Sequence, residues 1–389
     1  MLSFKQLIPL LLAAAIALPR TAAAQTGQER RNPIPVAVPV LNVVPDARAA
    51  AMGDMAVATS PDINAQHRNP AKYPFMNSKV GVGLSYVPWL RTLVMDVDIA
   101  YLTYFNRLDD MQSVSGSIKF FGLGEMAIMD AQGIKLADVR PYEMAMDVAY
   151  ARKFGNNFSG SLALRYIRSD LTGGHIPVDG NWAALRPANG FGADIGTYYQ
   201  GRHEDNDFGL GLAITNLGTK MAYSENAERY FLPTNLHLGG SYTFRIDFHN
   251  SFMMGLELSK LLVPTPPVRE GGTGPITRGK ENNVSVVEGL FQSFGDAPFG
   301  LREELSEVMW GFGMEYNYLN QFFARGGYFH DSKRKGNRRY MTFGAGIKYT
   351  FLSLDFSYLF PFTTNDPLEN TLRISLSFDI NTTRPAARR

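Results

Sequence analysis

The sequence contains no cysteine among its 389 residues, and this absence removes several kinds of chemistry. A chain without cysteine has no disulfide framework, no thiolate nucleophile and no cysteine-based zinc site. Charged residues make up only 19% of the chain, below the roughly 25% of typical soluble domains. The formal net charge is +2, whereas nucleic-acid binders need a strong basic excess to replace phosphate counterions. Composition therefore argues against a dedicated nucleic-acid binder.

Signatures of catalysis are also missing. The sequence has no Gly-x-Ser-x-Gly elbow, phosphate loop or dinucleotide fingerprint. Its six histidines are scattered and lack the spacing of a helical metal site. We therefore predict no enzyme, no cofactor and no bound metal. One alternative stays open: an enzyme that modifies lipid A or lipopolysaccharide, with a Ser and a His hidden in a barrel wall, for which adjacent His330 and Asp331 are a weak hint.

The only long apolar run lies near the N-terminus, at residues 7–18, and follows Lys5. Small residues come next, at Ala22, Ala23 and Ala24, as a signal peptidase requires before its cleavage site. The run is shorter than the roughly 20 residues of a spanning helix, which disfavours a membrane anchor. We interpret residues 1–24 as a secretory signal peptide. The exported chain is then periplasmic, secreted, or a barrel in an outer membrane.

Glycine and aromatic residues are abundant, and apolar residues alternate with small or polar ones. In residues 208–215, Phe208, Leu210, Leu212 and Ile214 share one face and small residues occupy the other. A period of two predicts a strand. A soluble sandwich also alternates, but its outer face usually carries Lys, Glu and Thr. Glycine, alanine and serine on the second face are instead expected inside a crowded closed cylinder, so we predict that the four large residues face lipid.

Fourteen segments show this pattern, and their number is even, as in bacterial outer-membrane barrels. They are residues 79–86, 97–105, 113–121, 144–154, 158–170, 190–203, 207–216, 235–246, 250–261, 308–318, 321–330, 339–349, 351–360 and 371–380. Short and long connections alternate along most of the chain, which a Greek-key sandwich does not require. We predict an all-β, 14-stranded antiparallel outer-membrane barrel over residues 79–380. Its long loops are expected to be extracellular, and its N-terminus and short turns periplasmic.

Residues 25–78 precede the first strand and are too apolar for a disordered tail. Residues 47–55 are predicted to form a short helix, and Asn69, Pro70 and Ala71 a turn. Because a barrel of this width needs filling, we expect this segment to be a hatch in the lumen; a periplasmic arm is the alternative. Residues 381–389 are predicted to be a basic tail.

Charged residues also occur on the strand faces predicted to point inward. They are Asp98, Lys119, Asp147, Arg165, Asp194, Glu257, Glu315, Arg325, Lys348, Asp355, Arg373 and Asp379. Their signs are nearly balanced. Because buried charges need partners, we favour a paired network that holds the hatch to the wall over an ion path.

Two predicted outer loops are candidate partner sites. Loop 262–307 contains an apolar stretch, and Leu290, Phe291 and Phe294 are candidate anchors for cargo or another partner. A second loop is basic, with Lys333, Arg334, Lys335, Arg338 and Arg339. Such loops are usually solvated, but this one is also expected near lipopolysaccharide phosphates or an acidic partner.

Residues 51–71, which end in Asn69-Pro70-Ala71, resemble the N-terminal signature of FadL-like barrels. Together with residues 44–48 and 51–54, they are more similar to one branch, the PorV family of type IX secretion outer-membrane proteins in Bacteroidetes. The resemblance implies Asp46, Arg48, Gly53, Asp54, Asn69 and Pro70 as hatch residues.

The same resemblance implies a carrier of secreted proteins rather than the export pore. Such a carrier binds the C-terminal signal domain of its cargo and accepts cargo from a large translocon barrel. It then delivers the cargo to an attachment complex that contains the sortase-like PorU, where lipopolysaccharide is attached. The alternative is a FadL-like channel for uptake of a hydrophobic small molecule, which the same barrel and hatch fit equally well.

Overall fold

The computed structural model describes residues 31–89, 96–129, 132–171, 176–178, 181–183, 187–223, 228–362, 368–369 and 371–382. The predicted signal peptide at residues 1–24 and residues 383–389 of the predicted tail lie outside these ranges. No helix within them is long and apolar enough to cross a membrane.

Fourteen antiparallel strands close into one barrel, as predicted. They are β1 (Ser78–Pro88), β2 (Asp98–Arg107), β3 (Gln112–Gly122), β6 (Tyr142–Lys153), β7 (Phe158–Asp170), β10 (Ala188–His203), β11 (Asn206–Gly218), β12 (Asn235–Arg245), β13 (Asn250–Leu261), β16 (Val308–Tyr318), β17 (Phe322–His330), β18 (Arg339–Tyr349), β19 (Leu352–Pro361) and β20 (Leu372–Thr382). Strand β1 pairs with β20, with Val82 opposite Phe378, so the sheet has no free edge. Each predicted segment overlaps one of these strands.

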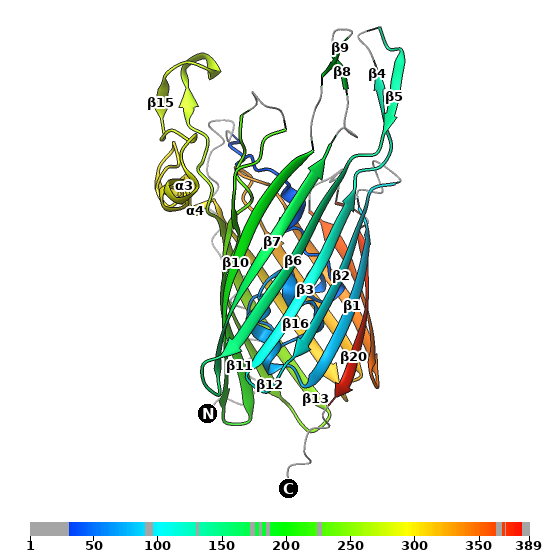
Figure 1. Ribbon diagram of the computed structural model, residues 1–389. Coiled ribbons are helices and arrows are strands. Elements are labelled where there is room, and N and C mark those ends of the chain that lie inside the picture. The colour runs from blue at the N-terminus through cyan, green and yellow to red at the C-terminus, as the bar shows by residue number, and fades with distance from the viewer. Residues whose placement is uncertain are drawn as a thin grey trace. The chain divides into compact units, whose positions relative to one another are not determined.

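Connections differ in length between the two rims of the barrel (Figure 1). One rim, called the short-turn rim, carries tight turns such as that at Leu319 and Asn320, which both have positive φ. The other, called the long-loop rim, carries hairpins and short helices. These are β4 (Met126–Met129), β5 (Lys135–Val139), β8 (Ile176–Val178), β9 (Asn181–Ala183), β14 (Val268–Arg269), η4 (Glu270–Gly272), β15 (Ile276–Arg278), α3 (Val286–Gln292) and α4 (Leu301–Leu305).

The two faces of each strand meet different surroundings. On β11, Leu212 is 44% exposed on the outer surface, whereas its neighbour Ala213 is buried against the interior. The predicted inward charges are buried except for Lys348, which is partly exposed, and Asp98. The prediction for Asp98 was wrong: it lies on the outer face of β2 and accepts a hydrogen bond from Tyr86 at 2.6 Å. This position is at the start of the strand, where a polar group lies close to the rim.

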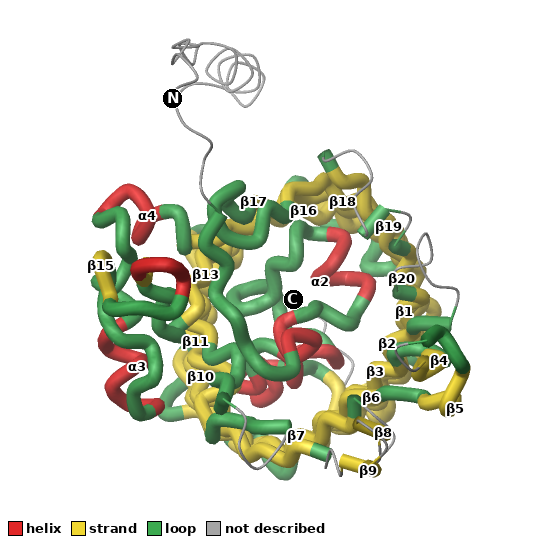
Figure 2. Tube along the Cα trace, turned by 90° about the horizontal axis from the view of Figure 1, so that it is seen from above, coloured by secondary structure: helices red, strands yellow, loops and turns green. Residues whose placement is uncertain are grey.

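Residues 32–77, called the luminal segment, lie inside the ring of strands (Figure 2). The segment contains η1 (Pro39–Asn42), α2 (Ala47–Ala51), η2 (Ile63–His67) and η3 (Pro70–Phe75). Helix α2 begins at Ala47 as predicted, but it ends at Ala51 and not at residue 55. The early end follows from Gly53 and Asp54, whose φ angles of 66° and 60° cannot continue a right-handed helix.

The luminal segment enters from the long-loop rim. The backbone N–H of Asn32 donates to the carbonyl of Arg334, and its side chain donates to Pro266 and Glu303, all in the long loops. The segment ends at Asn77, and β1 begins at Ser78 on the short-turn rim. Three long-range hydrogen bonds therefore hold Asn32 at the rim opposite the short turns. The N-terminus itself, predicted to lie on the side of the short turns, falls outside the described residues.

Candidate functional site

Helix α2 is fixed to the wall at its first turn. Asp46 is buried and caps the helix by accepting a hydrogen bond from the Ala49 N–H at 2.8 Å. The N–H of Ala47 is one of those left free at a helix start, and it donates to Ser375 of β20 at 2.8 Å. The cap and the wall contact together set the direction in which α2 points its side chains.

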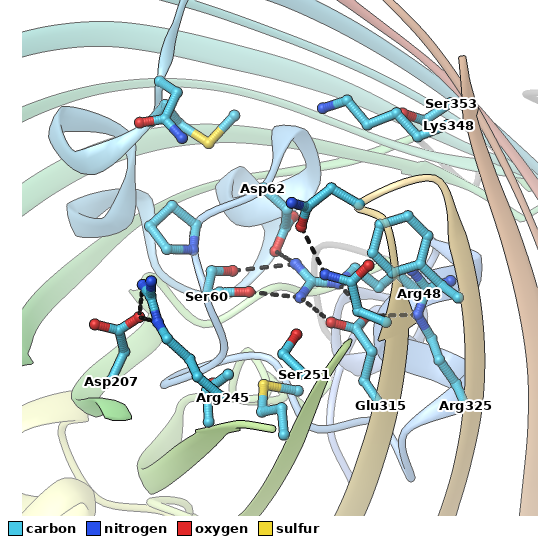
Figure 3. A pocket seen from close by; sticks show the side chains of 18 of the residues that line it. Arg48, Ser60, Asp62, Asp207, Arg245, Ser251, Glu315, Arg325, Lys348 and Ser353 are labelled. Carbon is cyan, nitrogen blue, oxygen red and sulfur yellow. Dashed lines mark hydrogen bonds and ion pairs between the residues drawn. The ribbon is translucent and has the colours of Figure 1, made fainter. Parts of the chain in front are cut away.

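Arg48 leaves α2 toward the short-turn side and joins the luminal segment to three strands (Figure 3). Its Nε and Nη2 each lie 3.0 Å from an oxygen of Glu315 on β16, and its Nη1 lies 3.1 Å from Asp62. Arg325 on β17 donates to the same Glu315 at 2.6 Å and to Asp355 on β19 at 2.5 Å. These alternating charges form a series of ion pairs that runs from the luminal segment to the wall. An open ion path would instead require charges that are not paired with one another.

Gly53 brings backbone directly against backbone. A Cβ at this position would lie 2.5 Å from the carbonyl oxygen of Tyr328 and 2.8 Å from that of Phe312. On the wall, Gly327 faces Gly53 equally closely, which explains glycine on the inward side of the strands. The Gly53 N–H donates to Thr342 at 3.0 Å, and Asp54 accepts from Tyr340 at 2.5 Å. The backbone at Gly53 and Asp54 is therefore held in place by both packing and hydrogen bonds.

Asn69 and Pro70 lie at the centre of a second anchoring point. The Asn69 side chain accepts from the Ala71 N–H at 3.2 Å and donates to the carbonyls of Val57 and Thr197 at 2.9 and 3.0 Å. Pro70 occupies the first position of η3, where a missing N–H costs nothing. One buried amide thus joins two parts of the luminal segment to strand β10.

Two further groups of charges link the segment and the wall. Glu257 accepts from the N–H groups of Ala56 and Val57 at 2.7 and 2.8 Å, and it lies 3.5 Å from Arg68. Arg165 pairs with Asp194 at 2.7 Å and with Asp147 at 3.1 Å, in the part of the wall that contacts Gln66. Most inward charges therefore have a partner.

Lys119 and Arg373 depart from this pattern. Lys119 donates to two carbonyls of the segment, at Val40 and Val43, and not to a carboxylate. The Nε and Nη1 atoms of Arg373 have no hydrogen-bond partner among the described residues, and its guanidinium lies 5.7 Å from the ring centre of Trp89. Near these cations the lumen is closed by apolar packing instead. The buried residues there are Ala37, Val38, Val40, Leu41, Val87, Val97, Ile99, Phe121, Ala145, Ile167, Ala188, Met221 and Leu232.

A cavity of about 1150 Å³ opens at the short-turn rim and ends at the luminal segment. Arg48, Asp62, Glu315 and Arg325 line its floor, and Arg245 and Asp207 lie on its side (Figure 3). These groups already form ion pairs with one another. Apolar side chains such as Phe75, Met253 and Phe323 also line it, so the cavity is a vestibule of mixed charged and apolar character.

Loop 262–307 lies outside the ring of strands, beside β11 and β13 (Figure 2). Its helix α3 begins after Ser285, whose side chain accepts from the Glu288 N–H at 3.3 Å. That start sets the helical phase, so Val287 and Phe291 share an exposed face, with Phe291 71% exposed, and Phe294, just beyond the helix, is exposed as well. Leu290, which we predicted to act with Phe291 and Phe294, is half-buried. On α4, Leu301 and Leu305 are also exposed, one turn apart.

The basic loop is only partly free. Lys335 is buried and lies 2.8 Å from Glu303 and 2.9 Å from Glu307, and Arg338 lies 3.3 Å from Asp331. Lys333 is exposed, and Arg334 and Arg339 are half-buried. Two of the five predicted basic residues therefore neutralise acids of the protein itself, and Lys335 joins this loop to loop 262–307.

An acidic cluster at this junction was missed from the sequence. Asp296, Glu304 and Glu307 each offer a carboxylate oxygen, and these oxygens lie within 4.8 Å of one another. The run Glu303, Glu304 and Glu307 was a signal, since residues three and four apart meet on one side of a helix. Asp296 could not be added from spacing alone, because a turn separates it from that helix.

The hint of a catalytic pair at His330 and Asp331 finds no geometric support. The His330 ring stacks on Trp310, with centroids 5.3 Å apart, on the outer face of the barrel. Asp331 is buried and accepts instead from Arg338 and from the Gly336 N–H. The two side chains thus engage different neighbours.

Several solved structures share this fold. A deletion mutant of TodX, described as a monoaromatic hydrocarbon channel, is 13% identical with a TM-score of 0.50, over 86% of this chain and 98% of that one. The Ralstonia pickettii toluene transporter TbuX is 12% identical with a TM-score of 0.48, over 88% and 100%. A Pseudomonas aeruginosa FadL homologue is 11% identical with a TM-score of 0.44, over 90% and 99%. At such identities the likeness shows the fold alone. No curated protein matches the chain in sequence.

A closed barrel of fourteen antiparallel strands with its lumen occupied by the preceding chain defines an outer-membrane β-barrel of the FadL-like fold. The profile of a family described as "Type IX secretion system protein PorV" matches residues 25–268. The chain belongs to this family of secretion-system barrels.

Proposed function

We propose that the protein is a non-enzymatic carrier of the type IX secretion system. It binds the C-terminal signal domain of cargo proteins, accepts them from the large translocon barrel and delivers them to the attachment complex that contains the sortase-like PorU. The family match carries this proposal. In this arrangement the long loops are extracellular and close to lipopolysaccharide, and the short turns are periplasmic.

Packing in the lumen supports carriage on the surface rather than passage through the barrel. The luminal segment acts as a hatch: the ion pair of Arg48 with Glu315 holds it on the short-turn side, and an apolar layer closes the long-loop side. A folded cargo domain cannot enter a lumen filled in this way, because interiors are close-packed. Uptake of a small hydrophobic molecule would require displacement of residues 37–41 and a route through the vestibule.

Loop 262–307 supplies a surface that fits a protein partner. Phe291, Phe294, Leu301 and Leu305 are exposed on and beside two short helices near the barrel rim. Large exposed apolar side chains are costly unless a partner covers them, and binding energy concentrates in a few such anchors. We place cargo or translocon contact here, with Phe291 and Phe294 as its centre. Lys333 and Arg339 of the basic loop provide positive charge for an acidic partner or lipopolysaccharide phosphate.

The docking surface can be tested by replacing Phe291 and Phe294 together with serine. Because both side chains are exposed, the barrel should fold normally, while co-purification of cargo or translocon should fall by tenfold or more. Phe248→Ser is the matched control, since Phe248 is fully exposed but lies in a turn at the short-turn rim. Wild-type co-purification by the double variant would refute the assignment of this surface.

Gene deletion tests the carrier function itself. A strain that lacks the protein should accumulate secreted proteins inside the cell with uncleaved C-terminal domains. Normal secretion combined with reduced uptake of a hydrophobic compound would instead establish the uptake channel. Normal secretion combined with altered lipid A would establish the modifying enzyme.

A further inference from the structure

A buried polar cluster joins loop 262–307 to the long-loop rim of the barrel. Loop 262–307 contributes Asp296, Glu303, Glu304 and Glu307, strand β13 contributes Lys260, and the basic loop contributes Lys335. Lys260 lies 2.9 Å from Glu304 and also contacts Glu307, while Lys335 contacts Glu303 and Glu307. Asn32 and Thr265 add hydrogen bonds to Glu303 and Glu307. The cluster thus connects three separate parts of the rim.

Charge in this cluster is unbalanced. Four carboxylates face two ammonium groups: Lys260 and Lys335 are shared among the three glutamates, and Asp296 has no ion pair in the described ranges. Buried charges are costly unless they are paired. An excess of two negative charges corresponds to the charge of one divalent cation.

Asp296 is the carboxylate of this cluster whose negative charge has no cation partner among the described residues. Its residue surface is only 2% exposed, and its Oδ1 atom is buried without a hydrogen-bond partner in the described ranges. Its other oxygen is held by the Thr265 N–H at 3.0 Å, which fixes the orientation of the carboxylate. A fixed, buried and unpartnered oxygen beside two further carboxylates is a ligand position.

We propose that Asp296, Glu304 and Glu307 bind a Ca²⁺ ion that fastens loop 262–307 to the barrel rim. All candidate ligands are oxygens, which suit hard cations and not zinc or copper. Their oxygens lie within 4.8 Å of one another. One Ca²⁺ ion bridges such separations, because ligand bonds of about 2.3–2.6 Å place opposite ligands up to about 5 Å apart. Water completes the coordination.

Occupancy of this site bears on the docking surface. Asp296 lies between the exposed apolar helices α3 and α4, so a cation there orders the two helices relative to the rim. This consequence rests on the proposed carrier function, whereas cation binding itself does not. Binding by the purified protein and secretion by the cell are therefore measured separately.

The test uses the purified full chain in detergent after treatment with EDTA. Calorimetric titration with CaCl₂ should show one saturable site, with a dissociation constant of about 10⁻⁴ to 10⁻³ M, as in extracellular Ca²⁺ modules. Calcium should also slow tryptic cleavage after exposed Lys280 in the same loop severalfold. Asp296→Asn and Glu304→Gln should each weaken binding by at least tenfold.

Glu288→Gln is the matched control, because it removes the same charge from an exposed position on α3 outside the cluster. It should bind Ca²⁺ like the wild type. Heat-modifiable migration on gels verifies that each variant retains the barrel. Protection of Lys280 from trypsin by Ca²⁺ is measured on the wild-type protein, so this result does not depend on whether a variant folds. Absence of saturable binding at about 10 mM Ca²⁺, or wild-type affinity in Asp296→Asn, would overturn the proposal. A secretion defect with intact Ca²⁺ binding, or the reverse, separates this site from the carrier function.

Discussion

The contact of Gly53 with the wall gives a prediction whose size follows from the coordinates. In Gly53→Ala the new Cβ would lie 2.5 Å from the Tyr328 carbonyl oxygen, about 0.7 Å inside normal contact, and strand backbone cannot retreat by that distance. Overpacking costs about 1–3 kcal/mol. The positive φ of 66° adds about 1–2 kcal/mol for a residue with a side chain. We expect the free energy of unfolding to fall by about 2–5 kcal/mol.

A matched substitution separates these two costs. Gly271 has a φ of 60°, but no atom lies within 4 Å of the place that a Cβ would occupy, so Gly271→Ala carries only the backbone cost. Unfolding in urea, followed by loss of heat-modifiable migration, measures both variants. Because the chain has no cysteine, a cysteine introduced by Ala58→Cys is a unique label for the luminal segment, and Ala58 is buried in the folded protein. When Gly53→Ala is added, labelling of this cysteine should rise about 5- to 150-fold, which corresponds to the contact cost alone. Equal destabilisation by both alanines, with unchanged labelling, would refute the close-contact argument.

Three further predictions test the wall, the luminal segment and the rim. Leu212→Arg on the lipid face should cost about 2–4 kcal/mol at mid-membrane, measured as a smaller amount of heat-modifiable barrel. Thr215→Arg, at a buried position, should instead disturb luminal packing and raise labelling of the cysteine in Ala58→Cys. Negligible effects of both variants would refute the register. Asn69→Ala should cost about 2–4 kcal/mol in urea, and Asn69→Asp at least as much, because aspartate keeps the cap but turns a buried carboxylate oxygen towards the two carbonyls that the amide served. The pKa of Asp296 in the folded protein, about 6, lies above the ordinary 3.8, so in EDTA the stability of loop 262–307 should fall as the pH rises from about 4 to 6 and change little above that. Hydrogen exchange of the loop measures this stability, and Asp296→Asn is the control. The same pH dependence in the wild type and in Asp296→Asn would contradict the prediction.

The barrel could be predicted because its two solvents impose a period of two on every strand. Large residues such as Leu212 face outward, and the inner face is limited to small or paired side chains by the chain that fills the lumen. Asp98 was misplaced because we assigned charges inward, whereas near a rim the outer face also accepts them. The end of α2 was misplaced because a contact with Thr342, far away in sequence, fixes the backbone at Gly53.

The rim sites were harder to predict because they depend on helical phase and on distant partners. The apolar stretch around Phe291 was visible, but its exposed side depends on where α3 begins, and that start makes Leu290 half-buried. Lys335 looked like a free surface charge, although its partners Glu303 and Glu307 lie about thirty residues earlier in a different loop. No local pattern encodes such a pairing.

The distribution of apolar surface bears on the choice between the proposed carrier and a conduit for hydrophobic molecules. A conduit for hydrophobic molecules needs apolar surface along its route, and burial of that surface by ligand provides the driving force. Here the short-turn entrance is lined by the paired charges of Arg48, Glu315 and Arg325 together with apolar side chains, and the apolar layer on the long-loop side is packed against the chain itself. The exposed apolar side chains of α3 and α4 lie outside the barrel, where a second protein can reach them without opening the lumen. That arrangement favours recognition at the rim over conduction through the barrel.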